Sequence, residues 1–433
     1  MRYWVKEVYL CSSLNFLKYI YLKKFWIIPT KPLKKADTFT YSIYRDNLAS
    51  IFKSIFQVCY TFHNSFSRIS VEKIVLFVGR KFQSNLPFQN YIKREVHAKV
   101  GEIDTYFYYA ENDNSLFLHL EKLLNKDAQI LIFATKAASS VVGKLLCTIT
   151  SDNQILKENM LIPSSTSMFE EDTYLLQYKK TTINVISAQE NQNLAQVLIK
   201  NESRFAEIQL FDIDIETANA LLNPLAQTYE VKLHFTDIVQ EWVLLTIESK
   251  RYGHISQFIS SASSLLNTKL IPASNIAAYI IEKLSHSNKK ISMAESCTGG
   301  LIASYLTKES GSSAIFDGSL VTYSNLLKAN WLAVDTATLE EYGAVSEETV
   351  LQMSEGVLNV SDANYAISVS GIAGPDGGSE VKPVGTVYIC VRSKQKVNAQ
   401  CLHFNGDRNY IQEQSALYAI KMLITLDKEL FFN

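Results

Sequence analysis

Short apolar runs alternate with longer segments of helical period from residue 72 onward. The runs EKIVLFVG, EIDTYFYYA and AQILIFAT are typical of buried strands, whereas NLPFQNYIKREVHAKV and SLFLHLEKLLNKD repeat apolar residues at helical spacing. Strands that alternate with helices favour an α/β fold built on a parallel sheet. We therefore predict an α/β domain over residues 72–190.

Two further units follow the polar run QENQNLAQ. Residues 203–272 give a strand, a helix, two alternating strands and another helix, which is the pattern of a small α+β module. Residues 275–433 return to strand and helix alternation, from KISMAES and GGLIASYLTK to NYIQEQSALYAIKMLITL. A chain of 433 residues is long enough for this multi-domain organisation.

Residues 1–71 form a distinct basic and aromatic extension. The whole chain has a formal net charge of −1, yet residues 1–70 hold 11 Lys and Arg against 3 Asp and Glu. Lysines interrupt each apolar run before the roughly 18 residues of a membrane span, and no signal peptide is evident. The extension could lie on an anionic membrane surface. We favour two simpler interpretations: the extension covers a hydrophobic face of the protein, or the start codon has been assigned too early.

Composition and cysteine spacing narrow the class of protein. Hydrophobic residues make up 47% and charged residues 20% of the chain, the balance of an ordinary globular protein. The near-zero net charge gives no global attraction to nucleic acid. Six cysteines contain no CxxC pair, which supports neither a zinc site nor a disulfide scaffold, and we expect a cytoplasmic location.

The segment AESCTGG contains three side chains that could act as nucleophiles, Ser296, Cys297 and Thr298. It falls where a predicted strand stops and a helix starts, and the free N–H groups of a helix start favour an oxyanion or a phosphate. Because Ser and Thr are also the commonest helix N-caps, capping alone explains this segment at least as well as catalysis.

Three other loops in the same unit also follow predicted strands. VTYSNLLK supplies Tyr323 and Lys328, GIAGPDGGSEVKPVGTV is a glycine-rich turn whose amides could bind phosphate or carboxyl oxygens, and FNGDRNY supplies Arg408. A guanidinium suits bidentate phosphate contact, although a surface Asp–Arg turn explains that segment equally well. Loops at the carboxyl ends of strands form the ligand crevice of open α/β sheets.

These four segments resemble the C-terminal domain of the CinA family, the competence/damage-inducible proteins. The motifs AESCTGGL, VTYSN..K, GIAGPDGG...KPVGTV and F.GDR stand intact and in order over roughly residues 275–428. The resemblance implies an α/β/α amidase domain that hydrolyses nicotinamide mononucleotide to nicotinic acid mononucleotide and ammonia in pyridine-nucleotide salvage, without a cofactor or metal.

The resemblance also implies roles for individual residues. Ser296 would be the nucleophile, Lys328 its base and Tyr323 an assisting phenol, since His286 and His403 lack the setting of a Ser–His–Asp triad. Attack by Cys297 is the competing hypothesis, because a thiolate is the better nucleophile at neutral pH. The substrate-binding candidates are Cys297, Thr298, Gly299, Gly374, Gly377, Gly378 and Arg408.

Full-length members of the family carry a molybdopterin-binding-like α/β domain and a KH-like connector before the amidase domain. Residues 72–190 and 203–272 match these in order and size, but the motifs are lost. VGRKFQSN and FATKAASSVVGKLL stand where the family has a glycine–acid signature and a TGGLGPT phosphate loop, and the connector has no GxxG loop. We expect a degenerate scaffold without nucleotide pyrophosphatase activity and without RNA binding.

Three hypotheses follow. The first is an amidase acting on a small pyridine nucleotide, which the family resemblance suggests is a homodimer. The second is a CinA-like regulatory protein that binds a nucleotide without turnover. The third, which the lost motifs disfavour, is a pyrophosphatase in residues 72–190.

Overall fold

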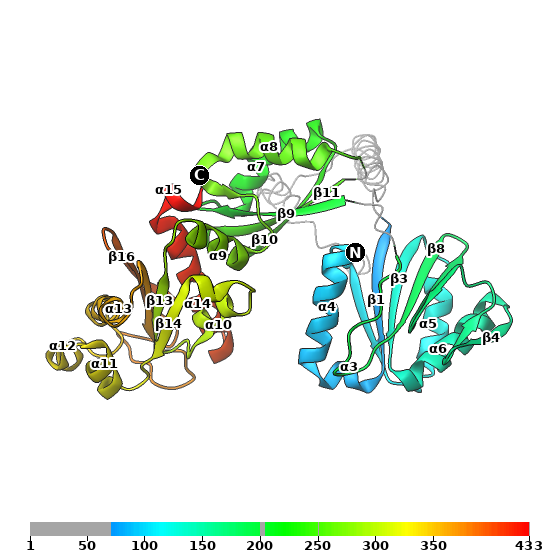
Figure 1. Cartoon of the computed structure of the whole chain (residues 1–433), viewed down its shortest axis with the longest axis horizontal. Helices are drawn as coiled ribbons and strands as arrows, with labels where there is room; N and C mark the ends of the chain where they lie inside the picture. The colour runs from blue at the N-terminus through cyan, green and yellow to red at the C-terminus, as the bar shows by residue number, and fades with distance from the viewer. Residues whose placement is uncertain (1–70, 200–203, 250, 433) are drawn as a thin grey trace, which may run out of the picture. The chain divides into compact units, whose positions relative to one another are not determined.

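The structure is a computed structural model that describes residues 71–199, 204–249 and 251–432. The predicted N-terminal extension lies outside the described residues, apart from its last position. The described residues form three main sheets of six, four and five strands, together with a separate two-stranded hairpin (Figure 1). This architecture confirms the predicted mixed α/β, multi-domain fold class. No helix of the described residues is long and apolar enough to cross a membrane.

The first sheet has the strand order β2-β1-β3-β8-β7-β6. Its strands are β1 (Glu72–Val78), β2 (Thr105–Tyr109), β3 (Ala128–Ala134), β6 (Met168–Glu170), β7 (Thr173–Tyr178) and β8 (Thr181–Ser187). The pairs β1–β2, β1–β3 and β3–β8 are parallel, while β7 runs antiparallel to both β8 and β6. The separate hairpin is β4 (Gln154–Lys157) and β5 (Met160–Pro163).

Helices cover both faces of this sheet, which explains the continuous apolar runs in its strands. Successive residues of β1 point to opposite faces, so Leu76 joins one core and Phe77 the other. The helix α4 (Leu86–Val100) covers the Phe77 face, and α5 (Ser115–Leu123) and α6 (Lys136–Thr150) cover the Leu76 face (Figure 1). A short helix, α3 (Arg80–Ser84), follows β1.

The second sheet is antiparallel throughout, in the order β10-β11-β9-β12. It is built from β9 (Arg204–Phe211), β10 (Lys232–Val239), β11 (Trp242–Ser249) and β12 (Leu270–Ile271). The helices α7 (Ile215–Thr228) and α8 (His254–Leu266) share one core with it, and the single turn η1 (Asn267–Lys269) follows α8.

The third sheet has the order β14-β13-β15-β16-β17. Its strands are β13 (Ile291–Glu295), β14 (Phe316–Val321), β15 (Tyr365–Gly371), β16 (Thr386–Ser393) and β17 (Val397–His403). Its helices are α9 (Ile276–His286), α10 (Leu301–Thr307), η2 (Ser312–Ala314), α11 (Asn325–Leu332), α12 (Thr336–Glu341), α13 (Glu347–Val360), α14 (Arg408–Leu426) and α15 (Lys428–Phe431). One core lies on each face, so the unit has three layers.

The parallel sheet predicted for residues 72–190 is confirmed for β2, β1, β3 and β8, whereas β7 pairs antiparallel with β8 and β6. In the third sheet β14, β13 and β15 are parallel, but β16 pairs antiparallel with both β15 and β17. No helix separates β15, β16 and β17 along the chain, and a parallel connection needs a crossover of a dozen or more residues. The connection between β16 and β17, residues 394–396, is too short for such a crossover, whereas β15 and β16 are joined by the longer glycine-rich loop.

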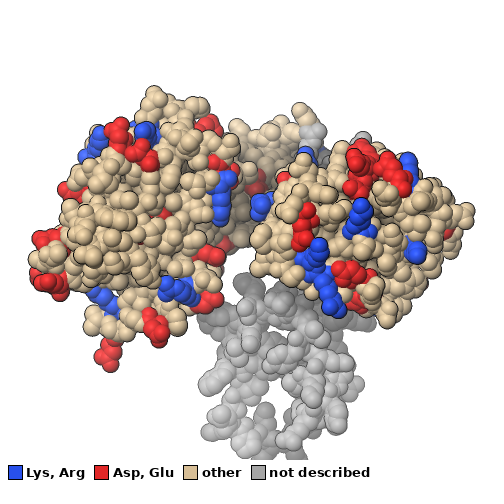
Figure 2. Space-filling view, turned by 60° about the horizontal axis from the view of Figure 1, so that its bottom comes forward, with Lys and Arg blue, Asp and Glu red and all other residues tan. Residues whose placement is uncertain are grey.

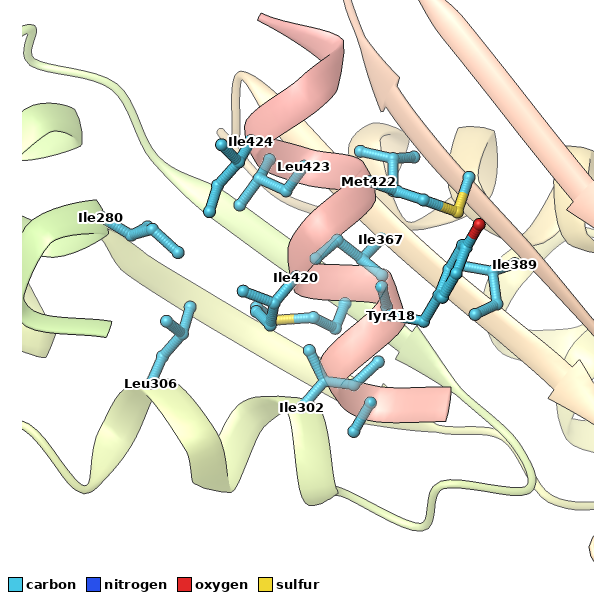
Figure 3. Packing of buried hydrophobic residues seen from close by; sticks show 14 of the residues in the cluster. Ile280, Ile302, Leu306, Ile367, Ile389, Tyr418, Ile420, Met422, Leu423 and Ile424 are labelled. Carbon is cyan, nitrogen blue, oxygen red and sulfur yellow. The ribbon is translucent and has the colours of Figure 1, made fainter. Parts of the chain in front are cut away.

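The helix α14 is buried along most of its length. Ile420, Leu423 and Ile424 pack among side chains of α9, α10 and the sheet, including Ile302 and Ile367 (Figure 3). The same core includes residues of the second sheet, among them Trp242. An amphipathic stripe is absent from this helix because it has neighbours on several sides, as expected for a central helix.

Candidate active site

Four loops meet at the carboxyl edge of the third sheet. The parallel strands β13, β14 and β15 end there, and β17 runs in the same direction as β15 because two antiparallel pairings separate them. The loop after β13 holds Ser296, the loop after β14 holds Tyr323, and the loop after β15 is glycine-rich. Arg408 begins α14 shortly after β17. All four predicted segments therefore lie at one sheet edge.

Ser296 and Lys328 are in direct contact inside this edge. The Lys328 Nζ lies 3.1 Å from the Ser296 Oγ, and the two residues are 1% and 8% exposed, respectively. Ser324 caps α11 by accepting the N–H of Leu327, which places Lys328 one turn into that helix, facing β13. A buried amine thus touches a nearly buried hydroxyl.

The surroundings of Lys328 favour its neutral form. Besides Ser296, its amine donates to the backbone carbonyls of Thr322 at 2.8 Å and Tyr323 at 3.2 Å, so its bonded partners are neutral oxygens. Burial lowers the pKa of Lys328 to about 8, because desolvation penalises the ammonium. About one tenth of such lysines are neutral at pH 7, which suits a general base.

Cys297 has an environment that favours the thiol. Its side chain is 4% exposed and belongs to the apolar core under α14. Burial raises the pKa of the Cys297 thiol to about 12, so almost no thiolate forms at neutral pH. The advantage that a helix N-terminus gives to a thiolate is therefore lost here, and the geometry favours Ser296 over Cys297.

Glu295, which the sequence analysis missed, organises the loop that carries Ser296. Its fully buried carboxylate accepts hydrogen bonds from the Thr298 hydroxyl, the N–H groups of Gly300, Ile302 and Ala303, and the Ser319 hydroxyl. The positive start of α10 and these five donors together offset the buried charge. The one sequence signal for this role is an acidic residue at the end of a buried strand.

The other predicted residues of this loop take distinct positions. The Thr298 hydroxyl donates to Glu295, and Gly300, not Thr298, is the N-cap of α10. Thr298 is therefore not the cap of α10, because the Glu295 carboxylate takes the free amides that a cap would serve. Gly299 and Gly300 have φ of 60° and 101°, a left-handed turn that favours glycine.

Replacement of Glu295 by glutamine is expected to lower the free energy of unfolding by about 2 to 4 kcal/mol. The glutamine amide would aim its own N–H groups at donors that now face oxygen, leaving buried groups unpaired. Denaturant unfolding of Glu295→Gln measures the change, with Glu380→Gln at an exposed loop position as the matched control. Equal stability of both variants would contradict the role assigned to Glu295.

Tyr323 and Arg408 are hydrogen-bonded to each other at the exposed rim of the site. Arg408 donates through Nη2 to the Tyr323 hydroxyl at 2.9 Å and through Nη1 to the Gly374 carbonyl at 2.6 Å. Tyr323 is 59% exposed and approaches Lys328 through its backbone carbonyl. The structure thus brings Tyr323 and Arg408 together at the exposed rim, and Ser296 and Lys328 together in the buried part of the site.

The glycine-rich loop closes over the same edge. Gly374 is buried, and a Cβ there would lie 2.6 Å from the Val384 side chain, so the two arms of the loop need the glycine to approach. Gly377 and Gly378 are exposed, with their backbone open to solvent. Lys382 fixes the loop by donating to the Tyr342 carbonyl at 2.9 Å.

The first sheet has a separate cavity of about 720 Å³ near the ends of β1 and β2. Its lining residues are Arg80, Gln83, Ser84, Tyr108, Ala110 and Asp113. Asp113 is the one carboxylate in this lining. Within residues 71–199, 204–249 and 251–432, no group of three or more His, Cys, Asp or Glu residues could hold a metal ion.

Charge on the molecular surface adds little to these sites. Figure 2 shows basic and acidic side chains interspersed over the face that it displays, without a broad patch of one sign. This face therefore lacks the basic stripe that marks a nucleic-acid-binding surface.

Comparison with known proteins identifies the family. The CinA C-terminal domain model matches residues 273–426. The nicotinamide-nucleotide amidohydrolase PncC of Enterobacter agglomerans is 51% identical over 132 residues, which cover 30% of this chain and 80% of that protein. The chain belongs to the CinA family. This confirms the family predicted from the four motifs.

Other CinA relatives also match part of the chain. A CinA-like protein of Fervidobacterium nodosum is 47% identical over 33% of this chain and 35% of its own length. A putative competence-damage inducible protein of Caldicellulosiruptor saccharolyticus is 38% identical over 46% of this chain and 47% of its own length. The chain thus spans less than half of the length of these two curated CinA relatives.

Solved CinA structures cover about a third of the chain. The competence/damage inducible protein CihA of Agrobacterium tumefaciens is 44% identical, with a TM-score of 0.35, over 35% of this chain and 93% of that one.

Proposed function

We propose that this CinA-family chain is a nicotinamide-nucleotide amidase that hydrolyses nicotinamide mononucleotide to nicotinic acid mononucleotide and ammonia. The observation that carries the proposal is the buried contact between the Ser296 hydroxyl and an amine whose pKa is lowered to about 8. An amide is a poor electrophile, so its hydrolysis needs an activated nucleophile and a base of this kind. The similarity to the amidohydrolase PncC supports the same reaction.

The reaction begins when neutral Lys328 takes the proton of the Ser296 hydroxyl, whose oxygen attacks the carboxamide carbon. The C=O electron pair moves onto oxygen, and the backbone N–H groups of Cys297 and Thr298 stabilise the resulting negative charge. The Lys328 ammonium then protonates the leaving nitrogen, the C–N bond breaks, and ammonia departs. A water molecule, deprotonated by Lys328, attacks the serine ester and releases the carboxylic acid and Ser296.

The rim of the site supplies candidates for binding the rest of the nucleotide. Arg408 donates two of its five N–H groups to Tyr323 and Gly374, and the remaining groups can donate to a phosphate oxygen. The exposed backbone of Gly377 and Gly378 offers further amides. We place the 5′-phosphate at this rim. Tyr323 would then lie between the phosphate and Lys328, with its hydroxyl on Arg408 and its backbone carbonyl on the lysine amine. A homodimer and a role in pyridine-nucleotide salvage belong to the same proposal.

The wild-type chain, assayed with a chelator present, is expected to release one ammonia and one nicotinic acid mononucleotide for each nicotinamide mononucleotide consumed. Nicotinamide riboside, which lacks the phosphate, should react with a much lower kcat/KM, because the rim contacts are lost. Coupled ammonia detection and chromatography of the products measure both. Tight binding of the nucleotide without any turnover would instead favour the regulatory hypothesis.

A further inference from the structure

The first turns of α14 touch all three of the other loops of the site. Arg408 and Gln412 are four residues apart and therefore lie on one face of the helix. Arg408 binds the Tyr323 hydroxyl and the Gly374 carbonyl, and the Gln412 Nε2 donates to the Cys297 carbonyl at 2.6 Å. One face of α14 thus fixes the positions of the loop that carries Ser296, the Tyr323 loop and the glycine-rich loop relative to one another.

The Gln412 contact fixes the peptide between Cys297 and Thr298. This peptide is trans, since Gly374–Pro375 is the one cis bond among the described residues, so its C=O and N–H point in opposite directions. Holding the Cys297 carbonyl against Gln412 therefore aims the Thr298 N–H away from α14. On the other side, Glu295 accepts the Thr298 hydroxyl and the Gly300 N–H, so the peptide is held from two directions.

The Thr298 N–H is an unused donor in a buried residue. Thr298 is 1% exposed, and no acceptor for its N–H lies among the residues that the structure describes. Buried backbone N–H groups are nearly always paired, and exceptions need an explanation such as a catalytic role. The position of this N–H, two residues after Ser296, is suited to an oxygen that becomes negative when Ser296 attacks.

We propose that Gln412 is a positioning residue that holds the Cys297–Thr298 peptide so that the Thr298 N–H points at the developing oxyanion. This inference rests on the proposed amidase function. The Gln412 side chain bonds to the Cys297 carbonyl and not to Ser296 or Lys328. It acts through the peptide, and the charge that this peptide stabilises exists only after attack, so the residue affects the transition state more than substrate binding.

Gln412→Met, which keeps the length but removes the donor, is expected to lower kcat for nicotinamide mononucleotide about 10-fold or more, with KM changed less than about 3-fold. Gln412→Glu, which keeps the shape but cannot donate, should show the same loss. Gln412→Lys, which restores an N–H donor, should recover most of the rate. Melting temperatures of all variants are recorded beside the kinetics.

Gln414→Met is the matched control. Gln414 lies on the same helix and also donates through Nε2 to a backbone carbonyl, that of Ile238 at 3.3 Å, but away from the site. This variant should keep wild-type kcat. Wild-type kcat in Gln412→Met and Gln412→Glu, or an equal loss in Gln414→Met, would overturn the role of Gln412 while leaving the amidase intact. An inactive wild type would instead remove the proposed function, and this inference with it.

Discussion

Ser296→Ala is expected to lower kcat for ammonia release from nicotinamide mononucleotide by about 10⁴-fold or more. The substitution removes the oxygen that attacks the carboxamide, and no neighbouring group can replace it. The Cys297 thiol is buried with a raised pKa, and the Thr298 hydroxyl is committed to Glu295. Steady-state kinetics measure the loss, and equilibrium binding of the nucleotide should survive, because the variant removes only one small polar atom.

Cys297→Ala is the matched control for this prediction. It changes the adjacent residue in the same loop and leaves the backbone amides in place, so kcat should stay within about 3-fold of wild type. A cavity where the thiol packs against α14 costs stability, which melting temperatures will report. If Cys297→Ala releases no ammonia and Ser296→Ala keeps its activity, the Cys297 thiol is the nucleophile and the assignment of Ser296 is wrong.

Lys328→Met is expected to lower kcat about 10³-fold or more while leaving the free energy of unfolding close to that of the wild type. Methionine fills nearly the same volume without an amine, so the Ser296 hydroxyl loses its base. Burying an ammonium costs stability, and removing that cost offsets the loss of the bonds to the Thr322 and Tyr323 carbonyls. Kinetics and denaturant unfolding of the same preparations measure both effects.

The pH dependence of the wild type follows from the same group. The pKa of Lys328 is lowered from 10.5 to about 8, so the rate should rise with pH up to about 8 as the neutral amine forms. Below about pH 8 folding buries the ammonium at its full cost, and this penalty fades as pH rises from 8 to 10.5, where folding releases the proton. In Lys328→Met, both the rise in rate and this stability gain should be absent.

A different result would change the assignment of Lys328. If Lys328→Met melts far below wild type and the rate of the wild type is flat between pH 6 and 9, the lysine is a structural donor to two carbonyls and not the base. Under the proposed mechanism, the loss of rate and the loss of pH dependence should occur together.

The sequence predicted where the site lies because each of its loops follows a strand that periodicity identifies. Strands that alternate with helices end at a common edge, so the loops bearing Ser296, Tyr323 and the glycine-rich turn were predicted to meet there. Local spacing also explains the position of Lys328. This residue lies one helical turn after the Ser324 cap, so its side chain points back at the sheet edge. Roles of these residues in catalysis remain predictions.

The contacts that hold the loops in place could not be predicted in the same way. Gln412 and the Cys297 carbonyl are separated by 115 positions along the chain, and no local pattern marks such a pair. Glu295 lies beside the nucleophile in sequence, but nothing local shows that its carboxylate turns inward to five donors. The antiparallel direction of β16 could not be predicted either, because strand periodicity is the same in both directions.

The burial of α14 has a consequence for biosynthesis. Its residues 408–426 leave the ribosome after every strand of the third sheet, so the nascent chain holds Ser296 and Lys328 well before the helix whose Gln412 contacts the Ser296 loop. Until that helix docks, the face of β13 and β15 that it shares with α9 and α10 is only partly covered, and the Cys297 carbonyl lacks its Gln412 donor. The nucleophile would therefore be synthesised long before it is competent, and activity would appear in a single late step of folding.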